Sequence, residues 1–370
     1  MLFADAGVSA SQISWLFVIW SLTSFVTEVP SGAWADLLDR RLLLVASATV
    51  YAGAFAAWLV LPTFAGFALG FVLWGISGSI MSGTLEALLY DELDVRGAAA
   101  LYPRLVGWAE SAAMLANLAS AGLAVPLLAV GGYALVGWAS VGLVGVHLAL
   151  AATLPVSTRA RRPHRDGDLL LATERLTQRY VAMLRTGVRE ATTSVDVRRA
   201  VLLAAVLVGL TAYDEYFPLV AREGGVALST VPALILVTVL GQAVGTALAG
   251  RAARLSSRTL GAMVLAGAGL VSAGATVTPY AGFVAIGVGY GLLNNTMIVA
   301  EARLQQVITG PARATVTSVH GLATEVVALC VYAAFAVGAG WLSWSTLVAA
   351  LGVPIVNVAW AVARWFPGPR

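Results

Sequence analysis

Residues 64–85 of the chain read FAGFALGFVLWGISGSIMSGTL, and none of them is charged. A membrane-spanning α-helix needs about 20 mainly apolar residues, because each adds about 1.5 Å and the hydrocarbon core is roughly 30 Å thick. The stretch meets this requirement, and similar runs lie before and after it. About eleven runs are found, at residues 12–34, 42–61, 64–90, 101–127, 132–155, 200–220, 228–250, 259–277, 280–302, 313–338 and 342–366. The sequence therefore predicts an all-α polytopic membrane protein with about eleven transmembrane helices.

The composition supports this fold class. Of the 370 residues, 59% are hydrophobic and 11% are charged, which is more apolar surface than a soluble core can bury. The single cysteine, Cys330, lies in an apolar run, so the sequence offers neither a disulfide framework nor a cysteine metal site. The net charge of +3 does not by itself indicate nucleic acid. We expect a lipid bilayer around the chain, with no cofactor, metal, nucleic acid or obligate protein partner.

The arginines fall on one side of the predicted topology. All 22 basic residues are arginine, and basic residues in short connections mark the cytoplasmic side of a membrane. Every second connection holds them, whereas the opposite connections hold only Arg222. This pattern places the C-terminus in the cytoplasm. Because the bias toward Arg, Ala, Gly and Val is typical of a GC-rich bacterial genome, we expect the plasma membrane of a bacterium.

The connection at 156–199 is the longest and divides the chain. It predicts an N-terminal bundle of five transmembrane helices at 1–155 and a C-terminal bundle of six at 200–370. Within the connection, apolar residues recur every four positions beside arginines, as in an amphipathic helix on the inner leaflet. These residues are Leu176, Tyr180, Leu184 and Val188. A strut between the bundles is favoured over a regulatory or partner-binding helix.

A constant shift relates acidic residues of the two halves. The number of residues from Glu86 to Glu301 is the same as the number from Glu110 to Glu325. We call this shift the repeat interval. Two six-helix halves related by a pseudo-two-fold repeat occur in transporter folds. The run at 200–220 has no partner in the first half, so we expect twelve helices minus the first, from either a mis-assigned start or a true truncation.

Residues 28–41, EVPSGAWADLLDRR, come at the end of the first run. They resemble the signature loop between the second and third helices of the major facilitator superfamily, which has a Gly, an Ala-Asp pair and Gly-Arg-Arg or Gly-Arg-Lys. The matching residues are Gly32, Ala35, Asp36, Arg40 and Arg41. Asp39 replaces the second Gly, a mild change because Asp tolerates a positive φ better than most residues. Residues 82–91, SGTLEALLYD, also resemble the end of the family's fourth helix.

The resemblance implies a two-bundle transporter that moves a small molecule by alternating access. In such a protein the motif would latch the two halves while the cavity opens outward. Asp36 would accept hydrogen bonds at the start of the tenth helix near Arg313, and the two motif arginines would meet the acids just after the third run. The expected latch residues are Gly32, Asp36, Arg40, Arg41, Asp91 and Glu92. The alternative is that the arginines only fix the topology.

Acidic residues inside the predicted membrane helices include Glu325, Glu110, Asp214 and Glu215. Such groups are costly in a membrane and are therefore candidates for function. Glu325 lies about 18 Å past Arg313 along a helix, which is near mid-membrane. A buried carboxyl group can bind and release a proton near neutral pH, so all four are candidates for proton coupling or substrate binding. The alternatives are structural hydrogen bonds for Glu325 and Glu110, and a solvated position near the outer end of the sixth helix for Asp214 and Glu215.

Further side chains are candidates for lining a substrate cavity: Glu28, Glu86, Glu301, Trp74 and Trp108. For Glu86 and Glu301, at the inner interface, a structural role in pairing the connections is favoured. The tryptophans would suit an aromatic or cationic substrate, and the alternative is an interface belt or lipid contact. The single histidines in apolar runs, His147 and His320, are interpreted as packed residues.

Proton-coupled efflux is the leading functional hypothesis, with uptake of a metabolite as the alternative. The family's drug antiporters carry a Gly-Pro-x-x-Gly-Gly element, and this chain offers a looser series, Gly122, Pro126, Gly131 and Gly132. No enzyme is expected. Ser77 and His147 resemble the serine and histidine of rhomboid proteases, but small residues in membrane helices usually serve close packing. A truncated transporter-like protein that transports nothing is the remaining alternative.

Overall fold

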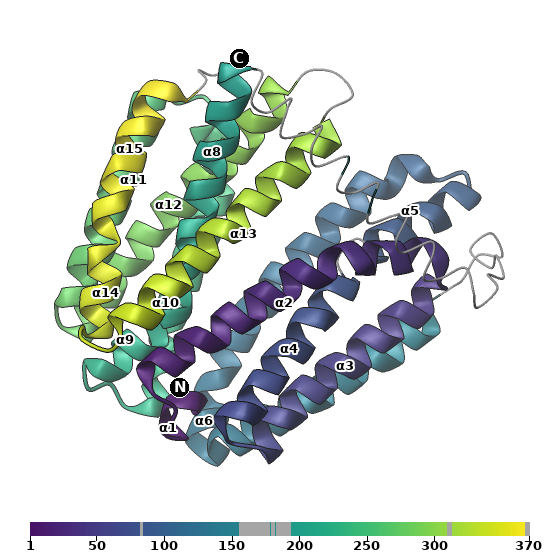
Figure 1. The fold of residues 1–370 in the computed structure, drawn as a ribbon, viewed down its shortest axis with the longest axis horizontal. Helices are drawn as coiled ribbons and strands as arrows, with labels where there is room; N and C mark the ends of the chain where they lie inside the picture. The colour runs from purple at the N-terminus through teal and green to yellow at the C-terminus, as the bar shows by residue number, and fades with distance from the viewer. Residues whose placement is uncertain (82–83, 155–177, 179–181, 183–193, 309–312, 367–370) are drawn as a thin grey trace. The chain divides into compact units, whose positions relative to one another are not determined.

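The computed structural model describes residues 1–81, 84–154, 178, 182, 194–308 and 313–366, which form helices joined by short connections (Figure 1). In this part of the chain, nine helical stretches are long and apolar enough to cross a membrane. One of them lies in α6 (Tyr102–Thr153), which joins two of the predicted spans across a break at Gly132, where φ is 58°. The predicted all-α membrane fold is confirmed.

The predicted span at 200–220 is not among the nine because its helix is interrupted. α8 (Val195–Gly209) leads into the 3-10 helix η3 (Leu210–Tyr216), and α9 (Phe217–Glu223) follows. Pro218 explains the interruption, since its nitrogen has no hydrogen to donate to a carbonyl four residues earlier and its ring clashes there. With α6 counted twice and this segment added, the described helices correspond to the eleven predicted spans.

The chain divides into two compact units. We call Leu2–Asn117 with Val130–Ala182 the N-terminal unit, and Met1, Leu118–Ala129 and Met183–Arg370 the C-terminal unit. The first helices of the N-terminal unit are α1 (Leu2–Asp5), α2 (Ala10–Leu37), α3 (Arg40–Val60), α4 (Phe64–Met81), α5 (Thr84–Val95) and η1 (Ala99–Leu101). Most of α6 completes this unit.

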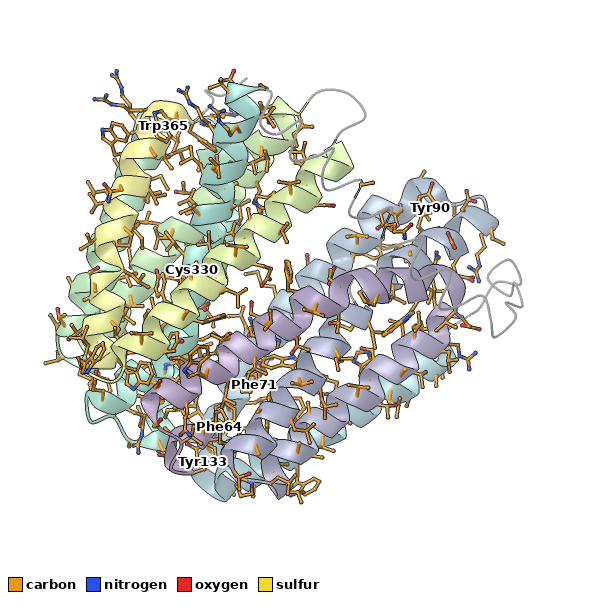
Figure 2. The ribbon with its side chains drawn as sticks, in the orientation of Figure 1. Phe64, Phe71, Tyr90, Tyr133, Cys330 and Trp365 are labelled. Carbon is orange, nitrogen blue, oxygen red and sulfur yellow. The ribbon has the colours of Figure 1, made fainter. Side chains whose placement is uncertain are left out.

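Aromatic rings fill the middle of the N-terminal unit. Phe71 of α4 is buried, with its ring centroid 5.3 Å from that of Phe3 and 5.6 Å from that of Phe17 (Figure 2). Tyr133, just past the break in α6, donates a hydrogen bond from its hydroxyl to Asp5. These contacts tie α1 to α2, α4 and the second part of α6.

Within its described residues, the C-terminal unit contains the interrupted segment and seven further helices. They are η4 (Leu228–Thr230), α10 (Val231–Ala252), α11 (Ser257–Thr276), α12 (Pro279–Val307), α13 (Arg313–Gly338), α14 (Trp344–Ala350) and α15 (Gly352–Trp365). α10 and α11 both pack on α12. A Cβ atom added to Gly245 would lie 2.3 Å from the carbonyl oxygen of Gly291. The backbones of α10 and α12 therefore lie in close contact, which is possible because small residues occupy the interface.

The structure supports the internal repeat. α2 ends at Leu37 and α10 at Ala252, while α4 begins at Phe64 and α12 at Pro279. Both pairs of helix ends are separated by the repeat interval. A polar contact recurs at the same spacing: the Thr27 hydroxyl donates to the Ser79 hydroxyl at 2.8 Å. Their equivalents are also paired, because the Asn294 amide donates to the Gln242 carbonyl at 3.1 Å.

The family motif takes a different local structure from the one predicted. Residues 28–37 extend helix α2, so only Leu38 and Asp39 connect it to α3. The φ of Asp39 is −62°, so the prediction that Asp39 replaces a glycine with positive φ was wrong. Its carboxylate instead accepts hydrogen bonds from the backbone nitrogens of Arg41 at 2.9 Å and Leu42 at 3.4 Å. Asp is present here because it caps the start of α3.

Candidate functional site

Asp214 and Glu215 lie on η3, at the interruption of a membrane segment. The hydroxyl of Tyr290 donates a hydrogen bond to the Asp214 carboxylate, with 2.5 Å between the oxygens. Tyr290 lies in α12, which begins at Pro279, and helical rise places it about 16 Å from that end of the helix. Asp214 is therefore near the middle of the span, deeper than the outer-end position predicted from the sequence. The reason is that α9 extends the segment to Glu223.

Tyr290 packs against two further aromatic rings, those of Tyr213 and Phe217. The ring centroid of Tyr213 lies 5.5 Å from that of Phe217 and 6.2 Å from that of Tyr290, both edge-on. Tyr213 is only 1% exposed, and its hydroxyl has no hydrogen-bond partner among the described atoms. A buried hydroxyl in this state is costly. It marks a place where a rearranged carboxyl group or a substrate could supply the missing bond.

Helix α13 brings the third predicted acid to the same place. α13 packs against η3, and Glu325 and Tyr332 are two turns apart on one face of α13. Tyr332 interacts electrostatically with Asp214, Glu215 and Glu325. Glu215 is exposed and Glu325 is half-buried. We call Tyr213, Asp214, Glu215, Tyr290, Glu325 and Tyr332 the acidic–aromatic cluster.

The sequence analysis identified the acids of this cluster but missed two of its tyrosines. Tyr290 and Tyr332 lie on α12 and α13, far from Asp214 along the chain. Nothing in a single sequence indicates that they meet η3. The available signal was local, namely Pro218 two residues after Tyr216, the last of a run of Tyr, Asp and Glu residues. A proline there predicts that the membrane helix is interrupted.

Several predicted site residues lie outside what the structure describes. Gly32 and Asp36 lie in α2, where the course of their backbone is described. The residues whose side chains are not described are Asp36, Glu86, Glu110 and Arg313. The apolar residues of the predicted amphipathic helix at 176–188 also lie outside the described residues.

The other cavity candidates are not part of the acidic–aromatic cluster. Glu28 and Glu301 are exposed on α2 and α12. Trp74 stacks on Trp20 with the centroids 4.8 Å apart, within the aromatic packing of the N-terminal unit. Trp108 is exposed and lies under the Arg104 guanidinium, 4.6 Å from the ring centroid. Such a cation–π contact is typical of a membrane interface.

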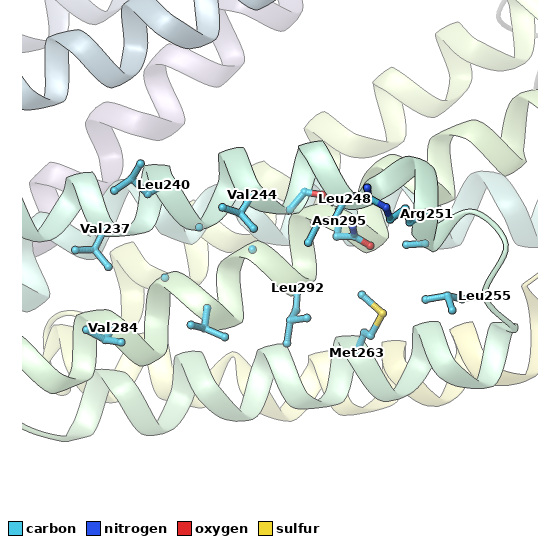
Figure 3. Close-up of a pocket in the computed structure, with 16 residues that line it drawn as sticks. Val237, Leu240, Val244, Leu248, Arg251, Leu255, Met263, Val284, Leu292 and Asn295 are labelled. Carbon is cyan, nitrogen blue, oxygen red and sulfur yellow. Dashed lines mark hydrogen bonds between the residues drawn. The ribbon is translucent and has the colours of Figure 1, made fainter.

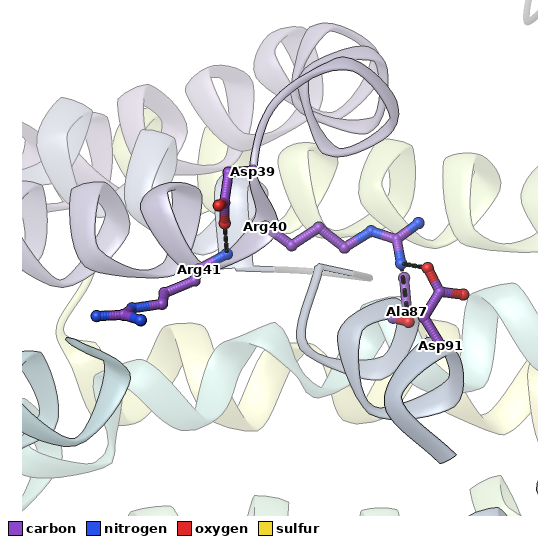
Figure 4. A network of polar contacts seen from close by, with 5 residues as sticks. All are labelled: Asp39, Arg40, Arg41, Ala87 and Asp91. Atoms are coloured by element: carbon purple, nitrogen blue, oxygen red, sulfur yellow. Dashed lines mark hydrogen bonds and ion pairs between the residues drawn. The ribbon is translucent and has the colours of Figure 1, made fainter. Parts of the chain in front are cut away.

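Arg40 makes the contact predicted for it. Its guanidinium forms an ion pair with Asp91 of α5 and donates to the carbonyl of Ala87 at 2.9 Å (Figure 4). Arg41 extends in a different direction (Figure 4), and Glu92 pairs with Arg96 at 2.5 Å. Arg40 and Asp91 both belong to the N-terminal unit. Their ion pair therefore braces α3 against α5 and cannot by itself latch two halves.

Arg303 makes a similar brace in the C-terminal unit. It is 2% exposed, and it donates to the carbonyls of Leu255 at 2.5 Å and Ala253 at 3.2 Å. Its guanidinium also lies 5.1 Å from the ring centroid of Phe366. Leu255 is the equivalent of Arg40 at the repeat interval, so the two units contain braces at equivalent places. In the N-terminal unit the arginine lies at the start of α3 and contacts α5. In the C-terminal unit the arginine lies near the end of α12 and contacts the connection between α10 and α11.

Ser77, the serine that suggested a protease, makes packing contacts. Ser77 is buried, and its hydroxyl donates to the carbonyl of Ser47 at 3.0 Å. The Ser47 hydroxyl in turn donates to the Ser77 carbonyl at 2.9 Å. The two serines thus join α3 to α4. Among the described residues, no group of three His, Cys, Asp or Glu could hold a metal ion.

Comparison with known proteins identifies the family. The model of the Major Facilitator Superfamily matches residues 1–329. The crystal structure of a D-xylose-proton symporter is similar with a TM-score of 0.70 and 17% identity, over 100% of this chain and 90% of that one. The nucleoside transporter NupG has a TM-score of 0.70 and 14% identity, over 98% and 92%. A bacterial homologue of the iron transporter ferroportin, in its inward-facing state, has a TM-score of 0.65 and 15% identity, over 98% and 92%.

No curated protein was found to match the sequence. The structural likenesses, all at low identity, show a transporter fold. The family model spans most of the chain, including the motif at 28–41 and the cluster residues from Tyr213 to Glu325. The chain belongs to the Major Facilitator Superfamily.

Proposed function

We propose that this protein moves a small molecule across a bacterial plasma membrane by alternating access, and that protons drive the movement through the acidic–aromatic cluster. The hydrogen bond from Tyr290 to Asp214, at a helix interruption in mid-membrane, carries the proposal. Ionisable groups at this depth are costly and are typical of proton relays and substrate pathways. Interrupted helices form the binding sites of several transporter folds.

Proton binding at Asp214 would change how η3 is held. An ionised Asp214 only accepts hydrogen bonds, and Tyr290 supplies one. A protonated carboxyl group also donates, and the buried hydroxyl of Tyr213 next to it has no partner among the described atoms. Exchange between these two arrangements would couple the charge of Asp214 to the packing of η3 against α12. Glu215, which is exposed, and Glu325 are the candidates for passing the proton or binding substrate.

Export in exchange for protons is the first direction to test. It rests on the resemblance of Gly122, Pro126, Gly131 and Gly132 to the antiporter element, which lies where α6 is broken at Gly132. The second candidate is uptake together with protons. It is favoured by the likeness of the fold to a D-xylose-proton symporter. Both directions use the same cluster, so they differ only in which way an imposed proton gradient moves the substrate.

The rest of the proposal concerns the arrangement of the chain in the membrane. We assign bundles to 1–155 and 200–370, a cytoplasmic linker to 156–199, and the C-terminus to the cytoplasm, on the basis of the arginine pattern. Asp36, next to the brace formed by Arg40 and Asp91, remains our candidate for the contact that latches the halves. The brace would keep the motif in position for that contact.

A transport screen tests the proposed function. The full chain is expressed in a bacterial strain that lacks its own efflux pumps, and accumulation of organic cations, D-xylose and nucleosides is measured with and without an uncoupler. Export predicts reduced accumulation of at least one compound, restored by the uncoupler. Uptake predicts increased accumulation that the uncoupler removes. If the wild-type chain reaches the membrane and no compound responds to the uncoupler, proton-coupled transport is contradicted for these classes.

A further inference from the structure

A long apolar groove lies within the C-terminal unit, and none of the residues that line it belongs to the acidic–aromatic cluster. It has a volume of about 570 Å³ and is lined by α10 and α12, by Leu255 of the connection after α10 and by Met263 of α11 (Figure 3). Val237, Leu240, Val244 and Leu248 follow one another along the α10 wall. The volume is within the range of sites that hold a small organic ligand.

The dimensions of the groove match a lipid tail. From Val237 to Arg251 the α10 wall covers about 21 Å at helical rise. The hydrocarbon of one leaflet is about 15 Å thick, half of the core. Leu240, Val244 and Val288 on its walls are all exposed, so in a membrane the groove opens onto hydrocarbon. An extended acyl chain fits both the length and the chemistry.

One end of the groove is polar. Arg251, near the end of α10, is exposed and lines it, and the residues that line it include no acid. Asn295, 3% exposed, donates from its amide to the Gly245 carbonyl at 2.8 Å, while its Oδ1 has no hydrogen-bond partner among the described atoms. Figure 3 shows Asn295 next to Leu248 and Arg251. A guanidinium has five N–H donors, which is enough for hydrogen bonds to Asn295 Oδ1 and to a bound anion at the same time.

We propose that this groove binds an anionic phospholipid, with one acyl chain along α10 and α12 and the phosphate on Arg251. Charge complementarity favours this occupant, because a guanidinium pairs with a phosphate through two parallel hydrogen bonds. The internal repeat predicts a single site of this kind. Asp36 is the equivalent of Arg251 at the repeat interval, and an acid at that position would repel a phosphate. This inference does not depend on the transported substrate.

Native mass spectrometry of the full chain, purified in mild detergent, tests the proposal with phosphatidylglycerol and phosphatidylcholine as probes. The wild type should retain one phosphatidylglycerol in preference to phosphatidylcholine. Arg251→Gln should lower that preference about tenfold, which corresponds to about 1.4 kcal/mol, because the charged hydrogen bonds to the phosphate are lost. Leu248→Trp, which fills the groove, should reduce retention of both lipids.

The matched control is Arg254→Gln, three residues further along the chain, exposed and outside the groove. It should keep the wild-type preference for phosphatidylglycerol. The proposal is overturned if Arg251→Gln also keeps it, or if Arg254→Gln loses it to the same degree, because the charge of the whole connection would then explain binding. Equal retention of both lipids by the wild type would overturn it as well.

Discussion

Single charged side chains inside the membrane segments are held by specific polar partners. Asp214 accepts a hydrogen bond from Tyr290. Arg303 donates from its guanidinium to the carbonyls of Leu255 and Ala253. Because an unpaired polar group costs more in a low-dielectric interior than in water, each partner matters for stability. In the proposed function, the hydrogen bond from Tyr290 also holds the ionised Asp214 that binds a proton.

Tyr290→Phe removes the hydroxyl that donates to Asp214. We expect it to lower the free energy of unfolding by about 1.5–3 kcal/mol, the usual value for a hydrogen bond to a charged group. Proton-driven flux in vesicles should fall with it. Tyr280→Phe is the matched control, since Tyr280 is an exposed residue of the same helix. Equal unfolding temperatures and fluxes for the two variants would mean that the Tyr290 hydroxyl has no such role.

Arg303→Gln leaves the carbonyls of the connection between α10 and α11 without their donor. We expect a loss of about 1.5–3 kcal/mol in the free energy of unfolding. Arg258→Gln, at an exposed position just beyond that connection, should be near neutral. Thermal unfolding in detergent measures both. If Arg258→Gln destabilises the protein as much as Arg303→Gln, burial of the Arg303 guanidinium is not the cause.

Residue types could be predicted from the sequence, and their partners could not. Asp214, Glu215 and Glu325 stand out because acids are rare in apolar runs. Tyr290 does not stand out, because tyrosine is common in membrane helices and its contact with Asp214 joins two distant parts of the chain. The ion pair of Arg40 with Asp91 could be predicted because a family motif places both residues. The brace by Arg303 has no motif and was missed.

The helices themselves are shaped by a few residues that stop or join them. Asp39 caps α3, Pro218 interrupts the sixth segment, and Gly132 breaks α6. Hydrophobic runs predicted where helices lie, because length and apolarity decide insertion. They did not predict that α2 continues through the motif to Leu37. The boundary between α2 and α3 depends on the capping hydrogen bonds of Asp39, and hydrophobicity does not predict such local hydrogen bonds.

Gly245→Ala tests the close packing of α10 on α12. The added Cβ would lie 2.3 Å from the carbonyl oxygen of Gly291, so one helix must shift, at a cost of about 1–3 kcal/mol. Gly250→Ala is the control on the same helix, where a Cβ meets nothing within 4 Å. It should be neutral or stabilise by up to about 1 kcal/mol through helix propensity. Similar unfolding temperatures for both variants would contradict the close contact.

For the whole molecule, the internal repeat and the arginine pattern predict one topology. A fluorescent protein that matures only in the cytoplasm, fused after Arg370, should be bright. The same protein inserted between Gly224 and Gly225, beyond α9, should be dark, because that connection lies on the opposite side in the arginine pattern. Fluorescence from the inserted protein, in a chain that reaches the membrane, would contradict the topology.

The central claim is that Asp214 couples protons to transport. It is tested most directly in vesicles that contain the purified chain and a pH-sensitive dye, to which a compound identified in the transport screen is added. The wild type and Asp196→Asn, an exposed acid in the first turn of α8, should both move protons when the compound is added. Asp214→Asn should move none while unfolding at a similar temperature. If Asp214→Asn moves protons as fast as Asp196→Asn does, Asp214 is not the coupling residue.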